Sequence, residues 1–136
     1  MTTGADSRRV AGRAITESSL TRQLIAVIEQ QMSGAVVLKH ADRYTSGIPD
    51  MSVTWRGVTT WWECKHAKPR FKSQGLQELI AARLAMHSAG CRYIIFGATR
   101  TYLVHPDQLH TWRDAAQYCN GYDLTWVVKR IEEFHR

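Results

Sequence analysis

The chain has 136 residues, of which 44% are hydrophobic and 22% are charged, and 18 lysine and arginine residues outnumber 12 aspartate and glutamate residues. This length and composition predict one globular domain, and they exclude a low-complexity chain. No window approaches the roughly 18 apolar residues of a membrane span. The formal net charge of +6 favours a polyanionic partner, and nucleic acid is the first candidate.

The cysteines indicate a reducing environment, because Cys64, Cys91 and Cys119 are odd in number and widely spaced. Without a CxxC pair, a zinc site built from thiolates is not expected. The N-terminus also lacks the apolar segment of a secretory signal. We therefore expect a cytoplasmic or nucleoid-associated protein in a reducing, intracellular compartment.

The first 31 residues predict an arm followed by a helix. Residues 1–14 are small, polar and basic, which is typical of a flexible basic arm that either contacts phosphates or forms a solvated tail; residues 15–136 form the single domain. Thr16 can cap a helix whose apolar positions recur at helical spacing through Met32. Glu17 lies at the end of the core-facing side of this helix, either as a functional acid or as a complement to the helix dipole.

A β-hairpin is predicted after the short strand 35–41. Residues 50–55 and 58–67 have the pattern of two strands joined by a turn at Arg56-Gly57. Since side chains alternate along a strand, Glu63 and Lys65 project to one side, and the hairpin brings Asp50 beside them.

The second half predicts a helix capped by Ser73, two strands over 91–98 and 101–105, a helix over 106–118 and a final helix over 124–134. The helix after Ser73 carries a broad apolar stripe, formed by Leu76, Leu79, Ile80, Leu84 and Met86. The resulting fold class is α/β, with a central mixed sheet flanked by helices.

Asp50 and Glu63 at close range repel each other, and burying them unpaired costs several kcal/mol. A divalent cation neutralises them: their oxygens, with the backbone carbonyl of Cys64 and waters, suit Mg²⁺ or Mn²⁺. Lys65 would then assist an attacking water or stabilise charge on a phosphate, and metal-bound water is an adequate nucleophile for a phosphodiester. The alternative is a solvated hairpin surface with a cross-strand salt bridge, worth about 0–1 kcal/mol.

"GIPD" at 47–50 followed by "WECK" at 62–65 resembles the core motif of the PD-(D/E)XK nuclease superfamily. With the glutamine-bearing helix and the apolar strand that follow, the sequence is most similar to the VRR-NUC branch. The resemblance implies a restriction-endonuclease-like core and an Mg²⁺- or Mn²⁺-dependent nuclease. It also implies selectivity for branched DNA such as four-way junctions.

Under this resemblance Asp50 matches the motif aspartate, Glu63 the second acid and Lys65 the lysine. Glu17 matches the acid of the first helix, where it would support a second metal or the water network. Gln77 corresponds to a glutamine of this branch, although Gln74 is only three positions earlier.

Basic residues on both sides of the hairpin are candidates for phosphate contacts. They are Lys39, Arg43, Lys68, Arg70 and Lys72. His40 or His66 could serve as a general base, which the chemistry does not require, and the five tryptophans are assigned to the core or to a dimer interface rather than to DNA. We thus expect a homodimeric DNA endonuclease with no small-molecule substrate; the alternatives are a non-catalytic DNA-binding or assembly module and an RNase.

Overall fold

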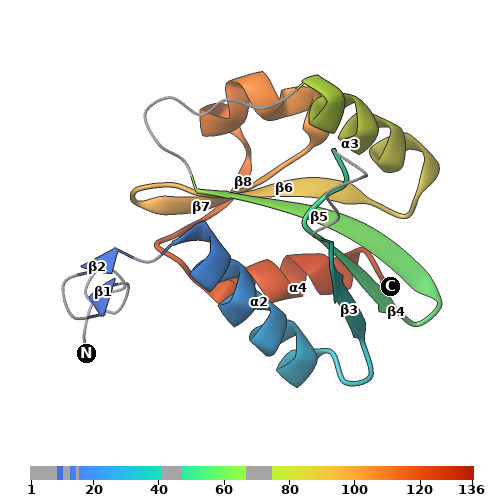
Figure 1. The fold of residues 1–136 in the computed structure, drawn as a ribbon, viewed down its shortest axis with the longest axis horizontal. Helices are drawn as coiled ribbons and strands as arrows, with labels where there is room; N and C mark the ends of the chain where they lie inside the picture. Colours follow the sequence, from blue (N-terminus) through green and yellow to red (C-terminus); the bar gives the residue numbers. More distant parts are fainter. Residues whose placement is uncertain (1–8, 11–12, 15, 41–46, 67–74) are drawn as a thin grey trace.

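A computed structural model describes residues 9–10, 13–14, 16–40, 47–66 and 75–136. It contains a six-stranded sheet with helices on both faces (Figure 1). In spatial order the strands are β3 (Val36–Lys39), β4 (Met51–Trp55), β5 (Val58–His66), β6 (Cys91–Phe96), β7 (Arg100–Val104) and β8 (Gln117–Asn120). The helices are α2 (Glu17–Gln31), α3 (Gly75–His87), the 3₁₀ helix η1 (Pro106–Asp114) and α4 (Leu124–Glu133).

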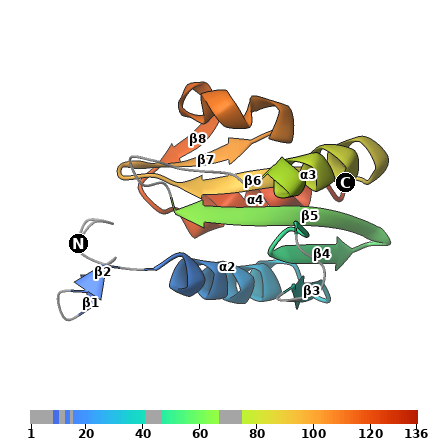
Figure 2. The same ribbon diagram turned by 45° about the horizontal axis from the view of Figure 1, so that its top comes forward.

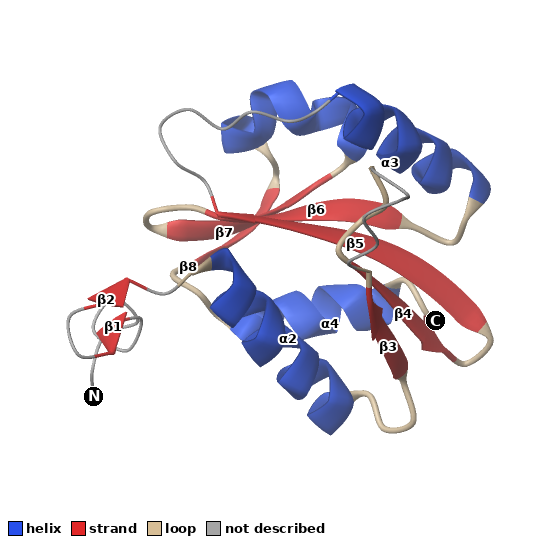
Figure 3. Cartoon of the chain, in the orientation of Figure 1, coloured by secondary structure: helices blue, strands red, loops and turns tan. Residues whose placement is uncertain are grey.

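The sheet is mixed because one crossover joins parallel neighbours. β5 and β6 run parallel and are connected through α3, whereas every other pair of neighbouring strands in the sheet is antiparallel. Figure 3 shows α2 and α4 on one face of the sheet and α3 and η1 on the other. The predicted α/β class with a central mixed sheet between helices is therefore confirmed.

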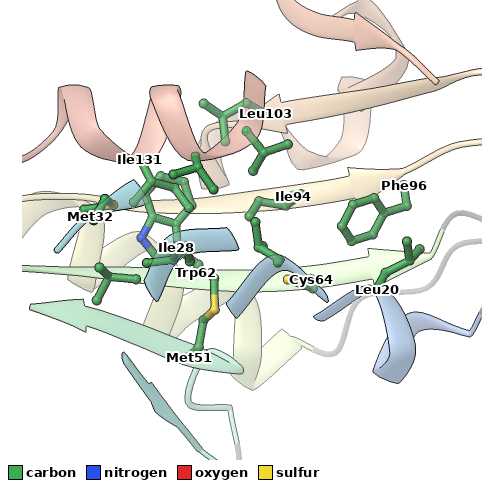
Figure 4. Packing of buried hydrophobic residues seen from close by; sticks show 14 residues of the cluster. Leu20, Ile28, Met32, Met51, Trp62, Cys64, Ile94, Phe96, Leu103 and Ile131 are labelled. Atoms are coloured by element: carbon green, nitrogen blue, oxygen red, sulfur yellow. The ribbon is translucent and has the colours of Figure 1, made fainter. Parts of the chain in front are cut away.

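Each face of the sheet has its own apolar core. On the α2 and α4 face, Trp62 and Cys64 of β5 are fully buried together with Ile94 of β6 (Figure 4). On the α3 and η1 face, Tyr93 and Ile95 of β6 are fully buried. The strand predicted over 91–98 is confirmed as β6, and it is buried on both sides because it lies between two helical layers.

The first helix and the hairpin are confirmed. Thr16 caps α2 by accepting a hydrogen bond from the Ser19 backbone N–H (3.1 Å). The hairpin turns at Arg56 and Gly57, whose φ angles of 53° and 77° match the two-residue turns that favour tight hairpins. This turn fixes the register in which Met51 faces Trp62.

The prediction of a helix over 106–118 is wrong at its C-terminal end, because the helix, a 3₁₀ helix, stops at Asp114. The chain leaves the helical conformation at Ala115 (φ −59°, ψ 136°), and residues from Gln117 form the edge strand β8 against β7. Pairing with β7 supplies partners for the β8 backbone, and this tertiary contact outweighs the helical periodicity of the segment.

The structure adds detail to two other segments. Within the predicted arm, β1 (Arg9–Val10) and β2 (Arg13–Ala14) form a short antiparallel ladder. The apolar stripe of α3 is only partly buried, since Leu76 and Leu79 are about half exposed and Met86 is 77% exposed. The helix instead contacts the sheet through Ala81, which is fully buried. The proposed cap, Ser73, lies outside the described residues.

None of the helices that the structure describes has the length and apolar character that a membrane crossing needs.

Gly90, in the connection between α3 and β6, offers a test of its packing against Phe134 at the end of α4. A Cβ added there would lie 2.5 Å from Phe134 Cδ1, and the Phe134 ring packs edge-on against Trp62. Because this ring would have to move, we expect Gly90→Ala to lower the free energy of unfolding by about 1–3 kcal/mol in urea titrations. Gly75→Ala is the matched control, since nothing lies within 4 Å of its added Cβ. Equal stability of the two variants would contradict this packing.

Candidate active site

The hairpin joins Asp50 and Glu63 by hydrogen bonds at the point where β4 begins. The Asp50 backbone N–H donates to Glu63 Oε1 (3.0 Å). In return, the Cys64 backbone N–H donates to Asp50 Oδ2 (2.9 Å). Each acid therefore anchors itself on the other strand, and the register of the hairpin determines their separation.

Lys65 completes this part of the site. Its Nζ lies 3.0 Å from Glu63 Oε2, and the two side chains are 22% and 2% exposed. The ammonium is therefore the accessible member of the pair, while the Glu63 carboxylate is buried beneath it.

Glu17 reaches the same region from another element. It is the first residue of α2, and its Oε2 accepts a hydrogen bond from the His66 backbone N–H (2.7 Å) at the end of β5. Figure 2 shows the start of α2 beside the end of β5. The structure thus brings together four residues predicted from the sequence: Glu17, Asp50, Glu63 and Lys65.

The "GIPD" segment has a local reason for its glycine. Gly47 has φ 90°, and a Cβ there would lie 2.8 Å from Ile80 Cδ1 and 3.2 Å from Leu76 Cγ of α3. Both the left-handed backbone and the close approach to α3 favour glycine. The loop that leads into Asp50 is consequently held against α3.

Burial and mutual repulsion dominate the electrostatics of the two hairpin acids. Burial raises the pKa of Asp50, against the opposing effects of the Cys64 N–H and the Lys65 charge, and Glu17 adds repulsion. Burial and then the Asp50 charge raise the pKa of Glu63 to about 7, although Lys65 opposes the rise. Near neutral pH the Glu63 carboxyl is therefore partly protonated in the metal-free protein.

Lys65 and Cys64 respond differently to the same surroundings. Burial lowers the pKa of Lys65, but the charges of Glu63, Glu17 and Asp50 outweigh it, so the net effect is a raised pKa and a fixed positive charge. Burial raises the pKa of the Cys64 thiol far above its ordinary value, and Asp50 adds to the rise. The thiol is therefore neutral, and Cys64 contacts the site through its backbone.

The remaining predicted residues are less closely tied to the cluster. Lys39, at the end of β3, lies near enough for its charge to lower the pKa of Asp50. Gln77 has a buried Oε1 that lacks a hydrogen-bond partner among the described residues, and no hydrogen bond in this part of the chain joins it to the acids. The other phosphate-contact candidates lie outside the described residues: Arg43, Lys68, Arg70 and Lys72.

The donor set suits a hard cation with few protein ligands. Among the described residues, no group of three or more His, Cys, Asp and Glu side chains is arranged to hold a metal ion. Mg²⁺ is commonly bound through only one or two carboxylates, with waters and substrate phosphates as the other ligands. Asp50 Oδ1 and Glu17 Oε1 have no hydrogen-bond partner in the described part of the chain, so the residues present fit such an ion.

The contacts that His40 and Tyr122 make at the site have no clear signal in the sequence. The His40 backbone N–H donates to the Asp50 carbonyl oxygen (2.7 Å), and the His40 ring lies 2.9 Å from Ser52 Oγ and stacks on Trp61. His40, a candidate general base, also positions the start of β4 through these contacts. On the far side, Tyr122 Oη lies 3.4 Å from His66 Nε2, so the C-terminal third reaches the Glu17 end of the cluster.

Comparison with protein-family models and with curated proteins finds no match to the sequence. The functional assignment therefore rests on the chemistry of the cluster formed by Glu17, Asp50, Glu63 and Lys65.

Proposed function

We propose that the protein is a Mg²⁺- or Mn²⁺-dependent DNA endonuclease with a restriction-endonuclease-like core. The observation that carries the proposal is the mutual anchoring of Asp50 and Glu63 across the hairpin, with Lys65 on Glu63 and Glu17 at the same end of β5. Three carboxylates around one ammonium leave an excess of negative charge. A cation explains this excess better than packing does.

The chain's own residues divide the work of hydrolysis. Asp50 and Glu63 would hold the cation, with the Cys64 carbonyl as a further oxygen and Glu17 as the acid for a second ion or for bound water. When bound, the ion would activate a water and stabilise the charge of the scissile phosphate. Lys65 places a permanent positive charge at the accessible rim, where it orients the attacking water or stabilises the phosphate.

The charge of the chain supports a polyanionic substrate. The formal net charge is +6, and Lys39 extends the positive charge to the β3 side of the acids. Arg43, Lys68, Arg70 and Lys72 would grip the phosphates that flank the scissile bond, and Gln77 would contribute from α3. A homodimer would cut both strands of branched DNA, and the three free cysteines suit a reducing, cytoplasmic compartment.

A panel of substrates tests the proposal. Purified protein is incubated with linear duplex, nicked, flap and four-way-junction DNA, and with RNA of matched sequence, in Mg²⁺, Mn²⁺ or EDTA. We expect metal-dependent cleavage of DNA, strongest on a branched substrate, and no cleavage in EDTA. If the protein cleaves RNA and none of the DNA substrates, it is an RNase. If it cleaves no substrate with either metal, the nuclease proposal is rejected.

A non-catalytic DNA-binding module is the second candidate. The ion pair between Lys65 and Glu63 neutralises one buried carboxylate without any metal, which a binding protein could retain for stability. This module would bind all the DNA substrates in a salt-sensitive way and would cut none of them.

A further inference from the structure

An arginine and two tyrosines form a layered cluster at the far edge of the sheet, on β7 and β8. The Arg100 guanidinium lies over the Tyr118 ring, 4.2 Å from its centroid. The Tyr118 and Tyr102 rings are neighbours across the two strands, with centroids 6.0 Å apart. We call Arg100, Tyr102 and Tyr118 the aromatic platform.

The helix η1 holds this platform from behind. Tyr102 packs edge-on against Trp112, with centroids 5.2 Å apart, and Trp112 is only 7% exposed. The Arg113 guanidinium covers Trp112 at 4.3 Å. Tyr118 is 41% exposed. The platform is therefore supported by the buried Trp112, and its Tyr118 side chain is accessible to solvent.

The strand register connects the platform to the candidate active site. Lys65 pairs with Ile95, Ile95 with Tyr102, and Tyr102 with Tyr118. Residues paired in this way project to the same face of a sheet, and neighbouring strands lie about 4.8 Å apart. Tyr118 is therefore three strands, or roughly 14 Å, from Lys65 along one row of the α3 and η1 face. Ile95, within this row, is fully buried, so the row gives the spacing between the two sites, which a few nucleotides can span, and not an open path over β6.

The charge of the platform matches phosphate. Among the described residues, neither Arg100 nor Arg113 forms an ion pair with a carboxylate. Proteins hold single strands with exposed aromatic rings beside unpaired arginines, because bases stack on the rings and the cations contact the phosphates. In the platform the exposed ring is that of Tyr118, since Tyr102 is partly buried. In duplex DNA the bases are stacked inside the helix, so they are not free to stack on a protein ring.

We propose that the aromatic platform binds an unpaired DNA strand whose neighbouring nucleotides reach the candidate active site. The substrate would then be DNA with a single-stranded segment beside the scissile bond, such as a flap or an open junction arm. The choice of DNA rests on the proposed nuclease function. The platform selects substrates through stacking and is separate from the residues that would perform the hydrolysis.

Binding in EDTA tests the platform without any hydrolysis. We expect Arg100→Gln and Tyr118→Ala each to weaken binding of an oligo-dT strand about tenfold, whereas Tyr118→Phe, which keeps the ring, binds as the wild type does. Arg100→Gln should also reduce the salt dependence of binding by about one phosphate contact. Blunt duplex binding should change much less.

Arg56→Gln is the matched control, because Arg56 stacks on Trp55 at 4.1 Å but lies at the opposite end of β5 from Lys65. It should bind oligo-dT normally, and thermal unfolding should show that all the variants are folded.

Normal oligo-dT binding by both Arg100→Gln and Tyr118→Ala would overturn the proposed binding role of the platform, even if the protein cleaves DNA. If the two substitutions weaken oligo-dT binding but the protein cuts no DNA with metal, the proposed nuclease function is rejected and the proposed binding role of the platform is kept. If the substitutions weaken binding of oligo-rU but not of oligo-dT, the choice of DNA is overturned.

Discussion

Replacing Lys65 by methionine is expected to lower the rate of DNA cleavage by about 100- to 1000-fold, the usual effect of removing one charged group that stabilises a transition state. Lys65 is the accessible cation of the cluster, 3.0 Å from the buried Glu63 carboxylate. DNA binding draws on many other basic residues, so its affinity should change little. The cleavage rate is measured under single-turnover conditions at saturating protein, so that binding does not enter the comparison.

The same substitution should cost little stability at neutral pH. Removing one partner of a buried ion pair usually destabilises a protein strongly, because a buried charge is left unpaired. Here the pKa of Glu63 is already about 7 with Lys65 present. Without Lys65 this pKa rises further, so at pH 7 Glu63 takes up a proton and carries no unpaired charge. The loss of stability should appear only as the pH rises above the pKa that Glu63 has in the variant.

Lys129→Met serves as the control for this variant, since Lys129 is an exposed lysine on α4 on the other face of the sheet. It should cut DNA at the wild-type rate. If Lys65→Met also cuts at that rate while the protein remains folded, Lys65 has no part in the reaction.

Replacing Asp50 by asparagine is expected to abolish cleavage and also the stabilisation that divalent cations give. An asparagine oxygen can still accept the Cys64 N–H that now bonds to Asp50 Oδ2, so the hairpin should fold as before. The substitution also removes a charge that raises the pKa of Glu63. Without metal, the variant should therefore equal or exceed the wild type in stability at pH 8.

The pH dependence of the metal-free wild type follows from Glu63. Its pKa rises from 4.5 to about 7 in the folded protein, so between these values the folded state binds more protons than the unfolded chain. Stability then falls as the pH rises from 4.5 through 7, by about 3 kcal/mol at most for this group. Asp50→Asn should flatten this fall.

Thermal and urea unfolding with and without Mn²⁺ measure the effect of Asp50. At a Mn²⁺ concentration 100 times its Kd, the wild type should gain about 2.7 kcal/mol, and Asp50→Asn should gain almost nothing. Asp114→Asn, at the exposed end of η1, should gain as much as the wild type. If Mn²⁺ stabilises all three proteins equally, the cation binds at a site that does not include Asp50.

The hairpin and its charged residues could be predicted from the sequence because their determinants are local. The Arg56-Gly57 turn sets the register, and the two-residue period of a strand places Glu63 and Lys65 on one side. Glu17 is different, since its contact with His66 spans 49 positions in the sequence. Its place was predicted from the apolar period of the helix and from the family resemblance.

Other features depend on tertiary contacts that no local pattern encodes. The segment around Tyr118 has a helical period, yet it pairs with β7 as an edge strand. Leu76 and Leu79 fit an apolar stripe, but α3 packs through the smaller Ala81. Tyr122 approaches His66 only because the β8 to α4 connection returns to the end of β5. Short polar strands and long-range side-chain contacts are decided by the whole fold.

The most direct test of a metal-dependent nuclease at this cluster is single-turnover cleavage of one labelled branched DNA substrate, with protein above its measured Kd. The reaction is run with wild type in Mn²⁺, wild type in EDTA, and Asp50→Asn in Mn²⁺. We predict product only in the first reaction, with equal DNA binding by the two proteins. Equal product from Asp50→Asn, or no product from the wild type in Mn²⁺, would contradict the assignment of Asp50, Glu63 and Lys65 as the catalytic centre.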